Sequence, residues 1–75
     1  MSKRTETDGI SIEWNGQIYN GYRVIEGTRK LFQTIHYKLD QEFDGHAYKP
    51  NETGYMKAIA KTILRELVER DQRKA

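Results

Sequence analysis

Cysteine is absent from this chain, and other residues that carry chemistry or interrupt folds are scarce. The 75 residues include one proline and two serines, and no apolar run approaches the length of a membrane span. Without cysteine there is no disulfide and no thiolate metal ligand, which fits a reducing cytoplasm. Because the sequence has neither an apolar signal region nor a stretch of about 20 apolar residues, we expect a soluble cytoplasmic chain that does not enter a membrane.

The groups needed for catalysis are also few. Ser2 stands in a polar tail and Ser11 in a predicted strand, and His36 and His46 are the only histidines. No glycine-rich phosphate loop joins a strand to a helix, and the carboxylates of Asp40–Gly45 have no apolar surroundings to raise a pKa. We therefore expect no enzymatic activity and no cofactor.

The acidic segment Asp40–Gly45 resembles the opening of a calcium loop, with Glu42 in place of its middle residue. The match fails later, because position twelve is Asn51 instead of a bidentate glutamate, and the flanking segments read as strands. A zinc site would need His36 and His46 together with a carboxylate such as Asp44. An acidic hairpin loop without a metal is the simpler interpretation.

Charge of either sign is only weakly in excess. Lysine and arginine number 13 against 11 acidic residues, a net charge of +2. This permits an acidic partner or a nucleic acid without requiring one, because phosphate binding depends on where the cations cluster. A chain this short buries only about 60% of its unfolded surface, so its core is small and dimerisation would help to stabilise it.

A stretch near the C-terminus, Tyr55–Arg70, has the clearest pattern. Its apolar residues recur in adjacent pairs every four residues, which predicts an amphipathic helix of about four turns. Asn51 or Thr53 is the expected N-cap. The predicted core contacts of this helix are Met56, Ile59, Ala60, Ile63, Leu64 and Leu67. Its opposite side carries a basic row, Lys57, Lys61 and Arg65, for which a solvated face is the default interpretation.

The preceding residues read as short strands. Residues 1–9 are predicted to be a flexible tail, and residues 10–72 one small domain. Ile10–Trp14 alternates apolar and polar residues, and Asn15-Gly16 is a strong hairpin signal. A two-residue loop would pair Ile12 with Tyr19, whereas a three-residue bulged loop would pair Ile12 with Ile18. We favour the bulged loop, because it gathers the aliphatic side chains on one face.

In that register the strand Gln17–Glu26 directs Ile18, Tyr22 and Val24 inward, and Asn20-Gly21 marks a bend or bulge. A turn at Gly27-Thr28 sets Val24 opposite Leu31. The next strand, Lys30–Leu39, then directs inward Leu31, Ile35, Tyr37 and Leu39, with Gln33 as a polar exception. His46–Lys49 is a candidate fourth strand, which Pro50 would end. The predicted fold class is α+β: a meander of three or four antiparallel strands with one C-terminal helix packed on one face.

The face of the sheet away from the helix is the candidate binding site. The favoured register places Arg23 opposite Phe32 and Tyr19 opposite His36. Lys30 and Lys38 flank these pairs, so the candidate residues are Tyr19, Arg23, Lys30, Phe32, His36 and Lys38. Interleaved rings and cations can stack bases while neutralising phosphates. The same residues could also stabilise the sheet through cross-strand pairs, or bind a protein partner or a second copy around Tyr19, Ile25 and Phe32.

Two resemblances follow from these segments. The run Ile-x-Trp-Asn-Gly-x-x-Tyr-x-Gly-Tyr-x-Val at Ile12–Val24, with Ala-x-x-Ile-Leu-Arg-Glu-Leu-Val at Ala60–Val68, resembles short uncharacterised bacterial proteins, and this implies no activity. The order of three strands and a helix is similar to AP2-type and integrase arm-binding DNA domains, which use the outer face of the sheet. Only Arg23 and Lys30 stand where those domains carry their cations. The prediction is therefore a small non-enzymatic interaction protein, bacterial or phage-like, with a nucleic-acid-binding module as the alternative.

Overall fold

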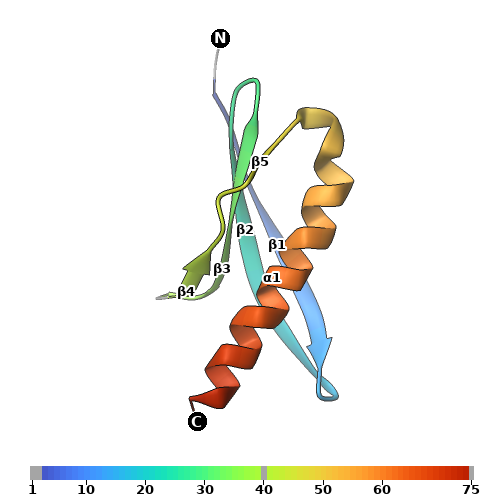
Figure 1. Ribbon diagram of the computed structural model, residues 1–75, viewed down its shortest axis with the longest axis vertical. Coiled ribbons are helices and arrows are strands. Elements are labelled where there is room, and N and C mark those ends of the chain that lie inside the picture. Colours follow the sequence, from blue (N-terminus) through green and yellow to red (C-terminus); the bar gives the residue numbers. More distant parts are fainter. Residues whose placement is uncertain (1–2, 40, 75) are drawn as a thin grey trace.

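The chain has the predicted α+β architecture. A computed structural model describes residues 3–39 and 41–74, and in it a helix crosses one face of an antiparallel sheet (Figure 1). The elements are β1 (Arg4–Trp14), β2 (Gln17–Gly27), β3 (Leu31–Lys38), β4 (Gln41–Phe43), β5 (Ala47–Tyr48), a 3₁₀ turn η1 (Pro50–Glu52) and α1 (Thr53–Arg73). The helix runs obliquely over the sheet and contacts mainly β1 and β3, so only one face of the sheet is covered by α1.

The strands follow one another across the sheet in the order β1-β2-β3-β4, and β5 also pairs with β3. The candidate fourth strand is present as β5, whereas β4 forms inside the segment that we interpreted as an acidic loop. Asp40, the first residue of that segment, lies outside the described residues, as do residues 1–2 of the predicted tail. The sheet therefore has one strand more than the alternation of the sequence indicates.

The prediction of a tail through Gly9 is wrong for residues 4–9. Strand β1 begins at Arg4, and its pairing with β2 runs without interruption from Arg4 opposite Gly27 to Trp14 opposite Gln17. The polar segment can pair because antiparallel strands are joined by backbone hydrogen bonds, which every residue type except proline can make. Residues 4–9 therefore extend β1 as a mostly exposed strand.

The predicted bulged loop is also wrong, and the two-residue alternative is observed. Asn15 and Gly16 have φ angles of 52° and 75°, the left-handed values that a type I′ turn requires at both central positions. This turn has the twist of the flanking strands, and Asn-Gly is its preferred sequence. Ile12 therefore pairs with Tyr19, and each side chain of β2 lies on the face opposite to the predicted one.

Long-range contacts explain why the observed register is stable. Arg23 is buried on the helix side of the sheet, where its Nε donates to Asp8 Oδ2 at 3.1 Å. Tyr19 lies between two other rings, with centroids 6.3 Å from those of Trp14 and Tyr37 in edge-on geometry. On the helix side of β2, which carries few aliphatic residues, an ion pair and a row of aromatic rings thus supply the stabilising contacts.

Gly21 does not mark a bulge, because the pairing of β1 and β2 is continuous there. It allows the helix to approach the sheet closely: a Cβ at this position would lie 2.7 Å from the His36 carbonyl oxygen and 2.8 Å from Leu64 Cδ1. The irregularity lies instead in β3, between His36 and Lys38. Beyond this shift Leu39 is fully exposed, so its predicted inward position is wrong.

The core lies between α1 and the sheet, as predicted. The predicted helix contacts are buried apart from Ile59, which is half-buried, and Val68 is buried as well. Gln33, the polar exception of β3, is completely buried, and its Nε2 donates to the Met56 carbonyl oxygen at 2.8 Å. This bond ties the first turns of α1 to the centre of the sheet.

The start of the helix differs from the prediction. Asn51 lies inside η1 and Thr53 is the first residue of α1, so neither acts as the expected N-cap. The Glu52 carboxylate accepts from the Lys49 backbone N–H at 3.2 Å, and the Glu52 N–H donates to the Lys49 carbonyl at 2.9 Å. Within the described residues, none of the helices combines the length and apolarity needed to cross a membrane.

Candidate interaction surfaces

The sheet face opposite α1, called here the outer sheet face, follows from the strand register. Side chains alternate along each strand, so residues paired across strands share a face. The register assigns to the outer sheet face Ile18, Asn20, Tyr22, Val24 and Glu26 from β2, Phe32, Thr34 and His36 from β3, and the odd-numbered residues of β1.

Exposed apolar and aromatic side chains are spaced along the strands of this face, with Asn20 and Val24 between them on β2; this row is called here the apolar band. Ile18, Phe32 and Tyr22 are 71%, 48% and 41% exposed, high values for large apolar side chains. The Tyr22 ring stacks on His36 with centroids 4.6 Å apart and planes at 6°, so both rings are held by their neighbours. Ordered, exposed rings of this kind are typical of protein-binding surfaces.

Of the six predicted site residues, only Phe32 and His36 lie fully on the outer sheet face. Tyr19 and Arg23 lie on the helix side of the sheet, because the two-residue turn reverses β2. Ile25, predicted to contribute to a dimer contact, is also on the helix side and only 2% exposed. The predicted pairing of Arg23 with Phe32 therefore does not exist, and Glu26 is the residue opposite Phe32.

Lys30 and Lys38, the two lysines of the predicted site, do not lie near each other either. Lys30 lies in the exposed segment between β2 and β3. Lys38 bends toward the helix, where its Nζ lies 2.6 Å from Asp71 Oδ2 and 5.2 Å from the centroid of the Tyr37 ring. This ammonium group, as a hydrogen-bond donor, lowers the pKa of the Asp71 carboxyl below its ordinary value.

The charges that do lie on the outer sheet face are mainly acidic. Lys3 Nζ lies 3.0 Å from Glu26 Oε2, and His36 Nδ1 lies 3.6 Å from Glu42 Oε2. Glu13 adds a further carboxylate near the hairpin end. A face of this composition lacks the cluster of cations with which proteins bind a phosphate backbone.

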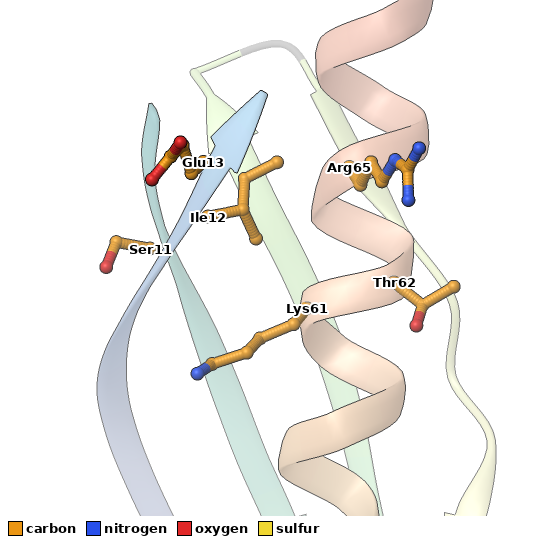
Figure 2. Close-up of a pocket in the computed structure, with 6 residues that line it drawn as sticks. All are labelled: Ser11, Ile12, Glu13, Lys61, Thr62 and Arg65. Atoms are coloured by element: carbon orange, nitrogen blue, oxygen red, sulfur yellow. The ribbon is translucent and has the colours of Figure 1, made fainter. Parts of the chain in front are cut away.

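A second candidate surface is a groove between β1 and α1. It is open, has a volume of about 360 Å³, and is lined by Ser11, Ile12, Glu13, Lys61, Thr62 and Arg65. Figure 2 shows Ile12 directed toward the helix and Lys61 reaching back toward β1, whereas Ser11 and Glu13 lie on the other side of the strand. Lys61 and Arg65, two members of the basic row predicted on α1, thus border the free edge of the sheet.

Of the residues considered for metal binding, His46 and Asp44 lie together, with His46 Nε2 3.2 Å from Asp44 Oδ1, whereas His36 lies beside Glu42. In residues 3–39 and 41–74 there is no group of three or more histidine or acidic side chains that could hold a metal ion. Asp44 serves the backbone instead: its Oδ1 accepts from the N–H groups of Gly45 and His46 at 2.8 and 3.1 Å. This closes the turn between β4 and β5.

The outer positions of Ile18, Tyr22 and Val24 are the main feature that the sequence prediction missed. The signal was present in the Asn-Gly dipeptide, whose preference for a two-residue turn decides the register. The groove along β1 carried no sequence signal of its own, because it depends on how α1 crosses the hairpin. No family model, no curated protein and no solved structure matches the chain, so its function has to be inferred from these surfaces.

Proposed function

We propose that this chain is a small non-enzymatic interaction protein and that its outer sheet face binds another protein. The observation that carries the proposal is the band of Ile18, Tyr22 and Phe32 on a sheet face that α1 leaves uncovered. Burying such side chains releases about 1.5–3 kcal/mol each. Of the three residues predicted for self-association through this face, only Phe32 lies on it, so we infer an unlike partner.

The electrostatics of the face favour a protein over a nucleic acid. The outer sheet face carries Glu13, Glu26 and Glu42, whereas Arg23 is buried on the other side and bonded to Asp8. A phosphate backbone would be repelled by the acids and would find few cations. An apolar protein surface would contact the band without this cost.

The partner surface should be flat and apolar, with cations at its rim. A sheet face is itself flat, and specific interfaces bury about 800 Å² on each partner. Tyr22 and Phe32 would be the central anchors, since aromatic residues dominate interface energetics. The stack of Tyr22 on His36 reduces the side-chain entropy lost on binding.

Site-specific photocrosslinking in cells that express the protein tests this proposal. A photoreactive phenylalanine analogue replaces Phe32 in one variant and Tyr55 in the other, since Tyr55 is an exposed aromatic residue on the helix. We expect a discrete protein adduct from position 32 and none from position 55. The identified partner, once purified, should bind wild type at least about tenfold more tightly than Phe32→Asp.

Two results would contradict the proposal. Equal adducts from both positions would indicate random contact instead of a binding face. Tight binding of single- or double-stranded nucleic acid, weakening steeply with salt and lost in Phe32→Asp, would support the alternative of a nucleic-acid-binding module. That module would have to use Phe32, His36 and Lys30 without Arg23.

A further inference from the structure

Strand β1 forms an unusually open edge of the sheet. It pairs with β2 on one side, and within the described residues no strand pairs with its other side. Its eleven residues contain no proline, and its register with β2 has no bulge. Natural edge strands are commonly short, bulged or interrupted by proline, because a long regular edge is a template for another strand.

The turn determines which backbone groups this edge offers. In a two-residue hairpin the residues that flank the loop, Trp14 and Gln17, form a hydrogen-bonded pair. The even-numbered residues of β1 therefore bond to β2, and the odd-numbered residues direct their N–H and C=O groups outward. The outward residues are Thr5, Thr7, Gly9, Ser11 and Glu13.

We propose that this edge pairs with β1 of a second copy of the chain, antiparallel, about a two-fold axis at Gly9. Gly9 is the midpoint of Arg4–Trp14, so this register lets all eleven residues pair. It makes each outward residue part of a hydrogen-bonded pair, with Thr7 opposite Ser11 and Thr5 opposite Glu13. It is an isologous contact, the commonest kind in homodimers.

Charge complementarity supports a second copy as the occupant. In this register the partner's Glu6 lies opposite Ile12, whose side chain points into the groove that Lys61 borders (Figure 2). Among the described residues of its own chain, exposed Glu6 bonds only to Arg4, two residues away, at 2.8 Å. The two-fold axis creates two such contacts between a carboxylate and the basic row.

Neighbouring registers are less favourable. A shift that centres the pair on Asp8 sets this carboxylate against the partner's Asp8, a like-charge pair in the closely spaced position. A shift that centres it on Ile10 moves the partner's Glu6 away from Lys61 and brings the partner's Asp8, already bonded to Arg23, to that place. Only the Gly9 register combines full overlap with complementary charge.

The proposed dimer goes beyond the binding function of the outer sheet face and does not rest on it. A two-fold axis perpendicular to the sheet keeps the outer sheet faces of both copies on one side. The result is a continuous sheet with two adjoining apolar bands and both helices on the opposite side. A glycine at the axis places no side chain between the bands.

Sedimentation equilibrium over a range of protein concentrations tests the dimer. The variants reverse the charge of Lys61, of Glu6, or of both. We expect wild type to dimerise, and Lys61→Glu and Glu6→Lys each to raise the dissociation constant at least about tenfold. The double variant should return to within about threefold of wild type, because the contact is reversed but complementary. Phe32→Asp, on the outer sheet face, should dimerise like wild type.

Amide hydrogen exchange provides a readout that does not depend on a variant folding. The outward amides of Thr7, Gly9 and Ser11 should exchange quickly in dilute wild-type protein and become protected as its concentration rises. A wild-type chain that stays monomeric up to about 1 mM would overturn the proposal. A dimer that is lost in Phe32→Asp but kept in Lys61→Glu, and in which these amides remain unprotected, would overturn the proposal as well.

Discussion

Replacing Gly21 by alanine should destabilise the packing of the helix on the sheet. The added Cβ would lie 2.7 Å from the His36 carbonyl oxygen and 2.8 Å from Leu64 Cδ1. The first atom belongs to the backbone of a neighbouring strand and the second to a fully buried side chain, so neither can move aside cheaply. Either β3 or α1 must shift by several tenths of an ångström.

The magnitude follows from two opposing effects. Overpacking a well-filled core costs about 1–3 kcal/mol, and alanine in a strand otherwise gains about 0.5–1 kcal/mol over glycine. The net loss of unfolding free energy in Gly21→Ala should be about 1–2 kcal/mol. For a domain of this size that lowers Tm by about 4–16 °C.

Gly9→Ala is the matched control. Gly9 also lies inside an extended strand of the same hairpin, one row away, but a Cβ there would meet no atom within 4 Å. We expect this variant to be as stable as wild type or about 0.5 kcal/mol more stable in urea titrations at one low protein concentration. Equal stabilities of the two variants would refute the close helix contact at Gly21.

Three further predictions concern ionisable groups. Asp8→Ala leaves the buried Arg23 guanidinium unpaired and should lower the unfolding free energy by about 2 kcal/mol, measured by urea titration. Burial raises the pKa of the Tyr48 hydroxyl above 10.0, so stability should fall as the pH rises through and above that value, and Tyr48→Phe should flatten this loss. The pKa of Asp71 is lowered in the folded chain, so its carboxylate adds stability at a pH above the ordinary pKa of the group. This stability is lost as the pH falls below about 4, and Asp71→Asn should remove this part of the acid dependence.

The control for the first of these predictions uses an exposed counterpart. Glu6→Ala removes an exposed carboxylate bonded to Arg4 and should cost less than about 0.5 kcal/mol in the same titration as Asp8→Ala, both at low protein concentration. An Asp8→Ala variant as stable as Glu6→Ala, or equal alkaline slopes for Tyr48→Phe and wild type, would contradict the assigned burial.

The helix and its buried side could be predicted because their signal is repeated and local. Four apolar pairs at a period close to 3.6 residues leave one interpretation, and the burial of Met56, Ala60 and Leu64 agrees with it. The same holds for β3, where Leu31 and Ile35 alternate with outward residues. The fold class follows from these two elements together with the hairpin signal.

The face of the sheet on which each β2 side chain lies could not be predicted from the alternation of residues within β2. Both sets of alternate residues contain apolar groups, so the hydrophobic pattern permits either register. Two features decide the register. Asn-Gly prefers the left-handed two-residue turn, and Asp8, fifteen residues from Arg23 in the sequence, compensates the charge of the buried Arg23 side chain. We gave the aliphatic grouping more weight than the turn, and the prediction for β2 was therefore reversed.

The reversed prediction for β2 also made part of the predicted candidate site wrong. Phe32 and His36 come from β3 and were assigned to the correct face, whereas Tyr19 and Arg23 come from β2 and were not. Strand β4 was missed because three residues are too few to show a period. Edge and groove features such as the one beside Lys61 arise from tertiary packing and have no local signature.

The succession of strands along the sheet also bears on how the chain folds. Each of the pairs β1–β2, β2–β3 and β3–β4 joins elements that are consecutive in sequence. Closing such short loops costs little entropy, and an isolated hairpin forms in about 1–10 μs. The sheet can therefore form outward from Asn15-Gly16 before α1, which is synthesised after the strands, docks over Gly21. An incomplete chain that lacks α1 would expose two apolar faces instead of one, which makes the helix a safeguard against aggregation during synthesis.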